Sequence, residues 1–178
     1  LMGAGRTEVM NCIAGDTRPD AWEIFVGGSS MPARFGHPSE AINGGGLASL
    51  PEEPRNYGIL PVMNIAENMT IANLPRFSGR LGINRRREVE TVEEMINSLR
   101  IKTPSWRQAI RNLSGGNQQK VILARWLVRG CAVLILDEPT RGIDVKAKKE
   151  IHDLLWSVRE RGDVSIIMVS SELQELMD

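Results

Sequence analysis

The 178-residue sequence has only two cysteines, few aromatic residues, no excess charge of either sign and no long apolar run. Cys12 and Cys131 lie in apolar or helical contexts without metal-ligand spacing, so we expect both to be reduced and buried. The longest apolar run, Cys131 to Leu136, is far too short to span a bilayer. Any membrane role is therefore expected to depend on a partner.

The absence of net charge bears on possible partners. With 22 basic and 22 acidic residues, the chain lacks the excess of positive charge that is typical of proteins that bind nucleic acid or an anionic membrane. One basic cluster begins at Arg85, but acidic residues follow it directly and predict a solvated helix face. We therefore expect no nucleic-acid partner. The charged residues of this face are Arg85, Arg86, Arg87, Glu88, Glu90, Glu93 and Glu94.

Length and composition predict one globular domain with a sizeable core, since 42% of the residues are hydrophobic and 25% are charged. The chain opens at Leu1 without an initiator methionine or a targeting segment, and it stops at Asp178 inside a helical pattern. We expect it to be a piece of a longer chain.

Two neighbouring stretches carry the chemistry. Leu113 to Lys120 reads Leu-Ser-Gly-Gly-Asn-Gln-Gln-Lys, a Ser/Gly turn that opens a helix. The free N–H groups of a helix N-terminus attract anions. Val133 to Glu138 is an apolar strand that ends in two carboxylates, at the end where open α/β sheets bind ligands. A phosphate site beside a carboxylate pair indicates nucleotide hydrolysis with Mg²⁺.

A third stretch, Gly3-Ala4-Gly5-Arg6-Thr7-Glu8, stands where a phosphate-binding loop would enter its helix. Gly3 and Gly5 allow close backbone approach, and the Thr7 hydroxyl can reach Mg²⁺. Arg6 replaces the compact lysine of the P-loop pattern, and Glu8 adds negative charge. Glu8 also excludes a dinucleotide fingerprint, because it takes the place of the third glycine. A glycine-rich helix start without a ligand remains the alternative.

Strand and helix patterns alternate along the chain, which predicts an α/β fold. Residues 76–84 are expected to form a glycine-containing linker. The expected strands are 22–26, 47–50 and a buried 164–169, and the expected helices are 9–14, 64–73, 85–99, 118–129 and 145–161.

Leu113 to Gln119 resembles the signature of ABC-type ATPases, and Val133 to Glu138 resembles their Walker B strand. The Asn117-Gln118-Gln119 extension and Pro139 to Asp144 are similar to bacterial sugar-import ATPases, and Gly3 to Glu8 is typical of their second nucleotide-binding half. The resemblance implies a P-loop NTPase three-layer α/β core with a helical subdomain. Residues 1–178 would be one partial domain, with the core at 1–60 and 112–178 and the subdomain at 64–111.

The resemblance also implies roles for single residues. Asp137 and Thr7 would hold Mg²⁺, and Glu138 would polarise the attacking water. Glu52 occupies the position of the Q-loop glutamine, and Ser171 stands where active members carry a histidine. The resemblance further implies nucleotide contacts, on this half or across a domain interface, by Gly3, Ala4, Gly5, Arg6, Thr7, Glu8, Ser114, Gly115, Gly116, Asn117, Gln118 and Asp144.

ATP and Mg²⁺ are the implied cofactors, and the implied function is the ATPase subunit of a monosaccharide importer. Its expected partners are the N-terminal nucleotide-binding half of the same protein, membrane permease subunits and, indirectly, an external sugar-binding protein. This arrangement would place it peripherally on the cytoplasmic face of the plasma membrane. A non-hydrolysing regulatory module is the main alternative. An ABC-type ATPase of DNA repair or chromosome structure is disfavoured because neither coiled-coil heptads nor a basic stripe occurs between the loop and the signature.

Overall fold

The computed structural model describes residues 5–18, 20–27, 33–50, 58–80, 82–173 and 175. The chain forms two compact units. The first comprises Leu1–Glu52, Cys131–Pro139 and Val158–Asp178, and the second comprises Glu53–Gly130 and Thr140–Ser157. Residues 112–130 and 140–157, which we expected in the α/β core, belong by their contacts to the second unit.

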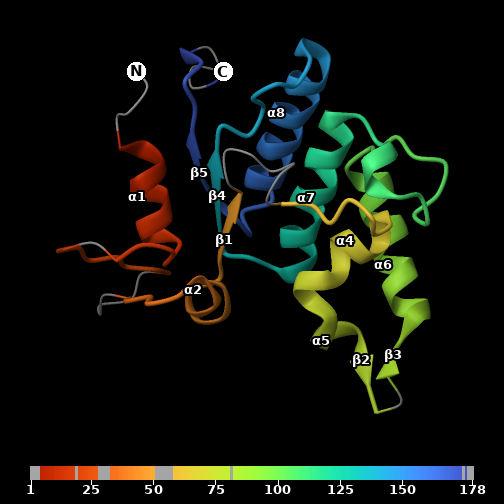
Figure 1. The fold of residues 1–178 in the computed structure, drawn as a ribbon, viewed down its shortest axis with the longest axis horizontal. Helices are drawn as coiled ribbons and strands as arrows, with labels where there is room; N and C mark the ends of the chain where they lie inside the picture. The colour runs from red at the N-terminus through yellow and green to blue at the C-terminus, as the bar shows by residue number, and fades with distance from the viewer. Residues whose placement is uncertain are drawn as a thin grey trace. The chain divides into compact units, whose positions relative to one another are not determined.

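The first unit is built on a parallel sheet with the strand order β1-β4-β5 (Figure 1). Its strands are β1 (Leu47–Leu50), β4 (Val133–Asp137) and β5 (Ser165–Val169). Leu47 pairs with Val133, and Val133 pairs with Ser165, so the first residues of the three strands are in register. The carboxyl ends of β4 and β5 consequently lie at one edge of the sheet.

Two helices pack against this sheet, α1 (Arg6–Ile13) on β4 and α2 (Pro38–Gly45) on β1. Their buried residues Met10 and Ala41 form one apolar cluster with Leu47 and Ile135 of the strands. Burial of such side chains is the main favourable term in folding. The helix expected to continue through 9–14 and the strand expected at 47–50 are therefore confirmed, and α1 ends one residue earlier than expected, at Ile13.

Two expected strands differ from the structure. In the described part of the chain residues 22–26 form no strand, and the bridge found there is the antiparallel pair Ile24–Ala33. The strand expected at 164–169 is present as β5, but it is not fully buried, because Ser165 and Ile167 are exposed. Within the described residues β5 pairs only with β4, and an edge strand keeps part of its surface exposed.

The second unit is mainly helical, and α7 packs on α4, α6 and η1. Its interior includes Ile65, Met69, Val92 and Val121, all fully buried. Its helices are α4 (Ile65–Thr70), η1 (Ile71–Asn73), α5 (Leu74–Phe77), α6 (Arg85–Ser98), η2 (Ile110–Asn112), α7 (Gly115–Arg129) and most of α8 (Val145–Glu160).

Side-chain caps explain where two of these helices begin. Asn64 precedes α4 and forms a reciprocal capping box with Glu67, in which both hydrogen bonds measure 2.9 Å. Asn84 precedes α6 and accepts a hydrogen bond from the backbone N–H of Arg87 at 3.1 Å. Such caps satisfy N–H groups that have no partner within the helix.

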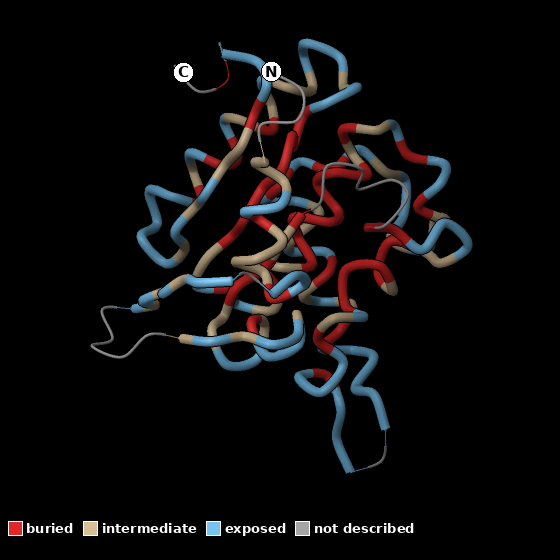
Figure 2. Tube along the Cα trace, turned by 60° about the vertical axis from the view of Figure 1, so that its left-hand side comes forward, coloured by how far each residue is buried: buried red, intermediate tan, exposed pale blue. Residues whose placement is uncertain are grey.

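The expected linker at 76–84 is instead the end of α5 and a short antiparallel hairpin, β2 (Ser78–Gly79) and β3 (Gly82–Ile83). Gly82 has a φ of +110°, a conformation that favours glycine and that lets so short a hairpin turn back. Figure 2 shows both strands of this hairpin exposed.

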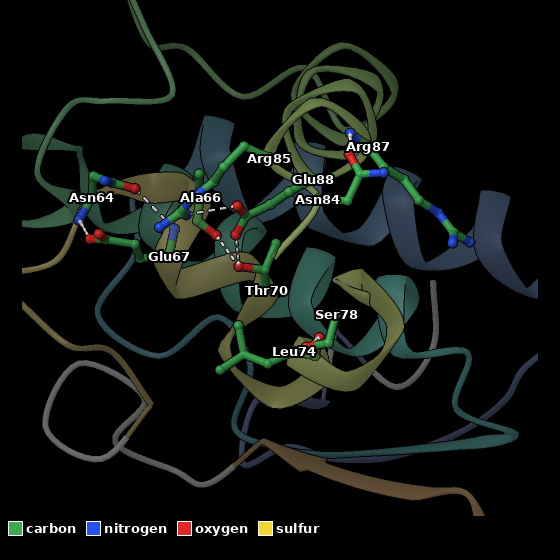
Figure 3. Close-up of polar contacts among 10 residues, drawn as sticks. All are labelled: Asn64, Ala66, Glu67, Thr70, Leu74, Ser78, Asn84, Arg85, Arg87 and Glu88. Carbon is green, nitrogen blue, oxygen red and sulfur yellow. Dashed lines mark hydrogen bonds and ion pairs between the residues drawn. The ribbon is translucent and has the colours of Figure 1, made fainter. Parts of the chain in front are cut away.

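Glu88 departs from the expected solvated face of α6, because only 2% of its surface is exposed. Its Oε1 lies 2.8 Å from the Thr70 hydroxyl of α4, and its Oε2 lies 2.8 Å from Nη1 of Arg85 (Figure 3). The carboxylate thus joins α6 to α4. A charged group is buried only where it has hydrogen-bonding partners. The pattern of charges along one helix does not show which residues of other elements supply them.

Both cysteines are free, but only Cys131 is buried, whereas Cys12 is half-buried. The expectation that both are buried is therefore wrong for Cys12. Burial raises the pKa of the Cys131 thiol. No helix among the described residues has the length and apolar character needed to cross a membrane.

Replacing Glu88 tests the α4–α6 contact. We expect Glu88→Ala to lower the free energy of unfolding by about 1 kcal/mol, because Thr70 loses its carboxylate partner and keeps only the Ala66 carbonyl. Urea denaturation measures the change. Glu90→Ala on the same helix is the matched control, since the Arg86–Glu90 pair is exposed and worth little. Equal losses for both variants would contradict the structural role of Glu88.

Candidate functional site

The carboxylate pair lies where β4 ends. Asp137 is the last residue of the strand and is 4% exposed, and Glu138, which follows it, is 9% exposed. Glu138 has a φ of +49°, in the left-handed region that non-glycine residues seldom adopt. Its N–H donates to the Val169 carbonyl of β5 at 2.9 Å, which holds this turned backbone in place. The sheet thus fixes two acidic groups at its carboxyl edge.

Ser171 meets Glu138 at this edge. The Ser171 hydroxyl donates a hydrogen bond of 3.1 Å to Oε2 of Glu138, although 33 positions separate the two residues. The pairing of Asp137 with Val169 brings their segments together. One oxygen of the expected water-polarising carboxylate therefore already accepts a hydrogen bond from the chain.

Arg6 reaches the same edge from the start of α1. Its Nη1 donates to the Ser170 carbonyl at 3.0 Å, so the guanidinium contacts the end of β5. Gly5, just before the helix, has a φ of +71°, which favours glycine at this turn. Thr7 is half-buried and Glu8 is exposed. Gly3, Ala4 and Glu52, also expected at the site, lie outside the described residues.

The other predicted group belongs to the second unit, at the N-terminus of α7. This helix begins at Gly115, three residues before the expected start at 118, with the exposed Ser114 as its N-cap residue. An N-cap serine usually accepts a hydrogen bond from a backbone N–H of the first turn, but the Ser114 side chain makes no such bond. The amide of Asn117 instead contacts the Ser114 hydroxyl at 2.8 Å.

The orientation of the Asn117 amide determines the direction of that hydrogen bond. Its Oδ1 lies 2.9 Å from the backbone N–H of Lys102, which can only donate. Nδ2 must then face Ser114, and because Nδ2 carries only hydrogens, the serine oxygen accepts. The hydrogen of the Ser114 hydroxyl is therefore left to be donated elsewhere.

Close packing surrounds this helix start. A Cβ on Gly116 would lie 2.7 Å from Cβ of Ala147 in α8, so only glycine fits without a shift. The buried Gln118 amide donates to the carbonyls of Ile110 and Leu113, which holds the segment that leads into α7. Asp144 caps α8, because its Oδ1 accepts from the Ala147 N–H at 3.0 Å. These contacts give Gln118 and Asp144 structural roles in the described chain.

A partly buried ion pair joins α7 to α8 beside this turn. Lys120 is 3% exposed, and its Nζ lies 2.8 Å from Oε2 of Glu150. The other carboxylate oxygen lies 3.3 Å from Nζ of Lys102. The hydrogen bond from Lys120 is the main cause that holds the pKa of Glu150 below its ordinary value. The sequence carried no signal for this pairing, because the three residues lie on separate segments.

No group of three or more His, Cys, Asp or Glu residues gathers as a metal site in the part of the chain that the structure describes. Asp137 with a hydroxyl such as that of Thr7 does fit Mg²⁺, which proteins often bind through one or two carboxylates together with substrate phosphates. The donor set therefore fits a magnesium ion that arrives with a nucleotide.

Comparison with known proteins gives consistent results. The family model described as ABC transporter matches residues 2–141. The chain is 44% identical over 178 residues to the xylose import ATP-binding protein XylG of Photobacterium profundum. It is 48% identical over 177 residues to the ribose import ATP-binding protein RbsA of Bacillus subtilis. Each match covers 99% of this chain but only 34% and 35% of the relative, so the chain spans about one third of their length.

A solved structure extends the comparison to the fold. A dimeric ATP-binding cassette in a post-hydrolysis state, bound to ADP and Pi, superposes with a TM-score of 0.75 at 19% identity. The match covers 96% of this chain and 72% of that chain. The likeness shows that the expected P-loop NTPase fold is correct.

Gly116 gives a test of the packing under the Ser/Gly turn. We expect Gly116→Ala to destabilise the chain by about 1–3 kcal/mol, because the added methyl overpacks against Ala147. Urea denaturation measures the loss, and adding Ala147→Gly should recover part of it. Gly44→Ala in α2 is the control, since a Cβ there meets no atom within 4 Å. A Gly116→Ala variant as stable as the control would contradict the close approach.

The Lys120–Glu150 pair predicts a pH dependence of stability. Its hydrogen bond keeps Glu150 ionised in the folded state, so the stabilisation is present above the ordinary value of 4.5 and is lost as pH falls through the lowered pKa. Glu150→Gln should therefore lower the free energy of unfolding at about pH 7, and the difference from the unsubstituted chain should shrink as the pH falls below 4.5. Asp153→Asn, in an exposed pair on α8, controls for general charge effects. A pH-independent difference would refute the assignment.

Proposed function

Because the chain belongs to the ABC transporter family, we propose that it is part of the ATP-hydrolysing, energy-coupling subunit of a bacterial monosaccharide importer. The observation that carries the proposal is the match of nearly the whole chain to import ATP-binding proteins at 44–48% identity. Those relatives are named for xylose and ribose, and this chain is assigned to their class of substrate rather than to one sugar.

The edge of the sheet would handle Mg²⁺ and water. Asp137 and Thr7 would hold Mg²⁺, which supplies charge neutralisation at the phosphates when it is bound. Glu138 would orient and polarise the attacking water, since its carboxylate is fixed at the end of β4. Glu52 would serve the Q-loop position. Positioning and charge stabilisation are the main requirements of phosphoryl transfer.

The α7 turn would act on a different nucleotide. Ser114, Gly115 and Gly116 would contact the γ-phosphate of ATP held by a partner domain, with Asn117 and Gln118 supporting them and Asp144 at the interface. The available Ser114 hydrogen and the N–H groups at the helix start supply suitable donors. The dimeric state of the similar cassette bound to ADP and Pi supports a two-domain arrangement.

The nucleotide site on this chain would be the weaker of the two. Arg6 replaces the usual lysine, and its guanidinium contacts the Ser170 carbonyl. Ser171 replaces a histidine and donates to Glu138, which engages the carboxylate that water would need. We infer that residues 3–8 bind nucleotide passively, while the turn at Ser114 completes the competent site of the partner half.

The partners follow from this role. We propose the N-terminal nucleotide-binding half of the same protein, membrane permease subunits and, indirectly, a sugar-binding protein outside the cell. Residues 64–111 would dock on the permeases, which places the subunit peripherally at the cytoplasmic face of the plasma membrane. The word "import" in the names of both relatives supports this placement.

Turnover of the assembled importer tests the asymmetry. We expect Ser114→Ala to lower ATP turnover by about 100-fold, because it removes a donor to the γ-phosphate, and Arg6→Ala to lower it by less than about tenfold. Steady-state phosphate release measures both. Exposed residues outside both the site and the proposed docking region provide the controls Ser165→Ala and Arg161→Ala.

The same measurement separates the alternatives. Equal losses for Ser114→Ala and Arg6→Ala would refute the division of labour between the two sites. Normal turnover in both variants would instead favour the non-hydrolysing regulatory module, for which the engaged Glu138 carboxylate is the supporting observation.

A further inference from the structure

We propose that Asn117 is a positioning residue that prevents Ser114 from capping α7, and that Glu150, through Lys102, holds Asn117 in that orientation. The inference rests on the proposed role of Ser114 toward a phosphate. In this proposal Asn117 acts by orienting Ser114 and does not itself contact the nucleotide.

The first step is the competition for the Ser114 hydroxyl. At an N-cap, a serine oxygen ordinarily accepts from the N–H of the second or third helical residue, which here would be Gly116 or Asn117. That bond would turn the serine oxygen toward the start of the helix, and it would use one of the N–H groups that an anion needs. In the structure the Asn117 side chain takes the place of the backbone donor, at 2.8 Å. The N–H groups of the first turn stay available.

The second step is the direction of the hydroxyl hydrogen. Since Ser114 accepts from Asn117 Nδ2, its own hydrogen is free to be donated to a phosphate oxygen. An aspartate at position 117 would reverse this, because a carboxylate only accepts and would take the serine hydrogen. The hydrogen bond from the Lys102 N–H to Oδ1 fixes the orientation of the Asn117 amide, so that Nδ2 faces Ser114.

The third step is the anchoring of Lys102. Its segment follows Arg100, which has a φ of +51° and whose carbonyl lies 3.4 Å from the buried Nζ of Lys120. Glu150 binds the Lys102 and Lys120 ammonium groups with its two oxygens, at 3.3 Å and 2.8 Å. The Lys102 side chain is 67% exposed, so its ion pair adds little stability, and its effect is on the placement of the backbone N–H.

The experiment measures kcat, KM for Mg-ATP and Tm of the assembled importer subunit for Asn117→Ala, Asn117→Asp, Glu150→Gln and the double variant Asn117→Ala/Glu150→Gln. We expect Asn117→Ala to lower kcat about tenfold, as misplacement of a contacting group does, with KM and Tm nearly unchanged, because Ser114 is then free to cap the helix. Asn117→Asp should lower kcat further. Glu150→Gln should lower kcat less, by about threefold, because it reaches Asn117 indirectly, through the Lys102 segment. The loss of its bond to Lys120 should appear separately, as a lower Tm.

The double variant tests whether the two residues act along one path. Its kcat should match that of Asn117→Ala alone, since residues in one network are non-additive. Asp153→Asn, a charge removal in an exposed pair of the same helix, should leave kcat unchanged. Two independent losses that multiply in the double variant would overturn the proposal. So would a fall in Tm that accounts for the lost activity of Asn117→Ala.

Ser114→Ala separates this proposal from the proposed function. If Ser114→Ala leaves turnover intact, the role of the turn toward a phosphate is wrong, and the positioning role falls with it. If Ser114→Ala lowers turnover but Asn117→Ala and Asn117→Asp do not, only the positioning role is wrong.

Discussion

Parallel pairing of β4 with β5 sets Asp137 opposite Val169, and the chemistry of the first unit depends on that register. Because both strands run the same way, the segments that follow them leave the sheet at one edge. The N–H of Glu138 then bonds to Val169, and the Ser171 hydroxyl reaches the Glu138 carboxylate. A shift of one residue would turn Asp137 to the opposite face and separate these groups.

The second unit depends on close packing at the start of α7. Gly116 lies against Ala147 of α8, where no side chain fits, and Lys120 meets Glu150 one turn further along. These two contacts hold the helix start against α8, while the Asn117 amide diverts Ser114 from its ordinary capping bond. The turn therefore presents a hydroxyl hydrogen and backbone N–H groups, which is the donor arrangement a phosphate requires.

Several features could be predicted because they depend on local physics. Helical spacing of apolar residues indicates Val121, Ala124, Leu127 and Val128 as the inward face of α7, and all of them are buried except Leu127, which is half-buried. The same spacing in α8 indicates Ile151, Leu154, Leu155 and Val158, which are all buried. Glu88 was misjudged because its partner Thr70 lies 18 positions away, in another helix, and only that contact makes burial of the carboxylate favourable.

The sequence by itself determined the family and the order of strands and helices around the motifs, and it indicated the candidate residues for phosphate and Mg²⁺, because residue type and short spacing encode these properties. Tertiary structure alone decided which of those groups are already engaged: Glu138 by Ser171, Arg6 by the Ser170 carbonyl, and Ser114 by Asn117, whose partner is the Lys102 backbone. A hydrogen bond depends on distances of a few tenths of an ångström between segments that the fold brings together, and no periodicity along the chain encodes such distances.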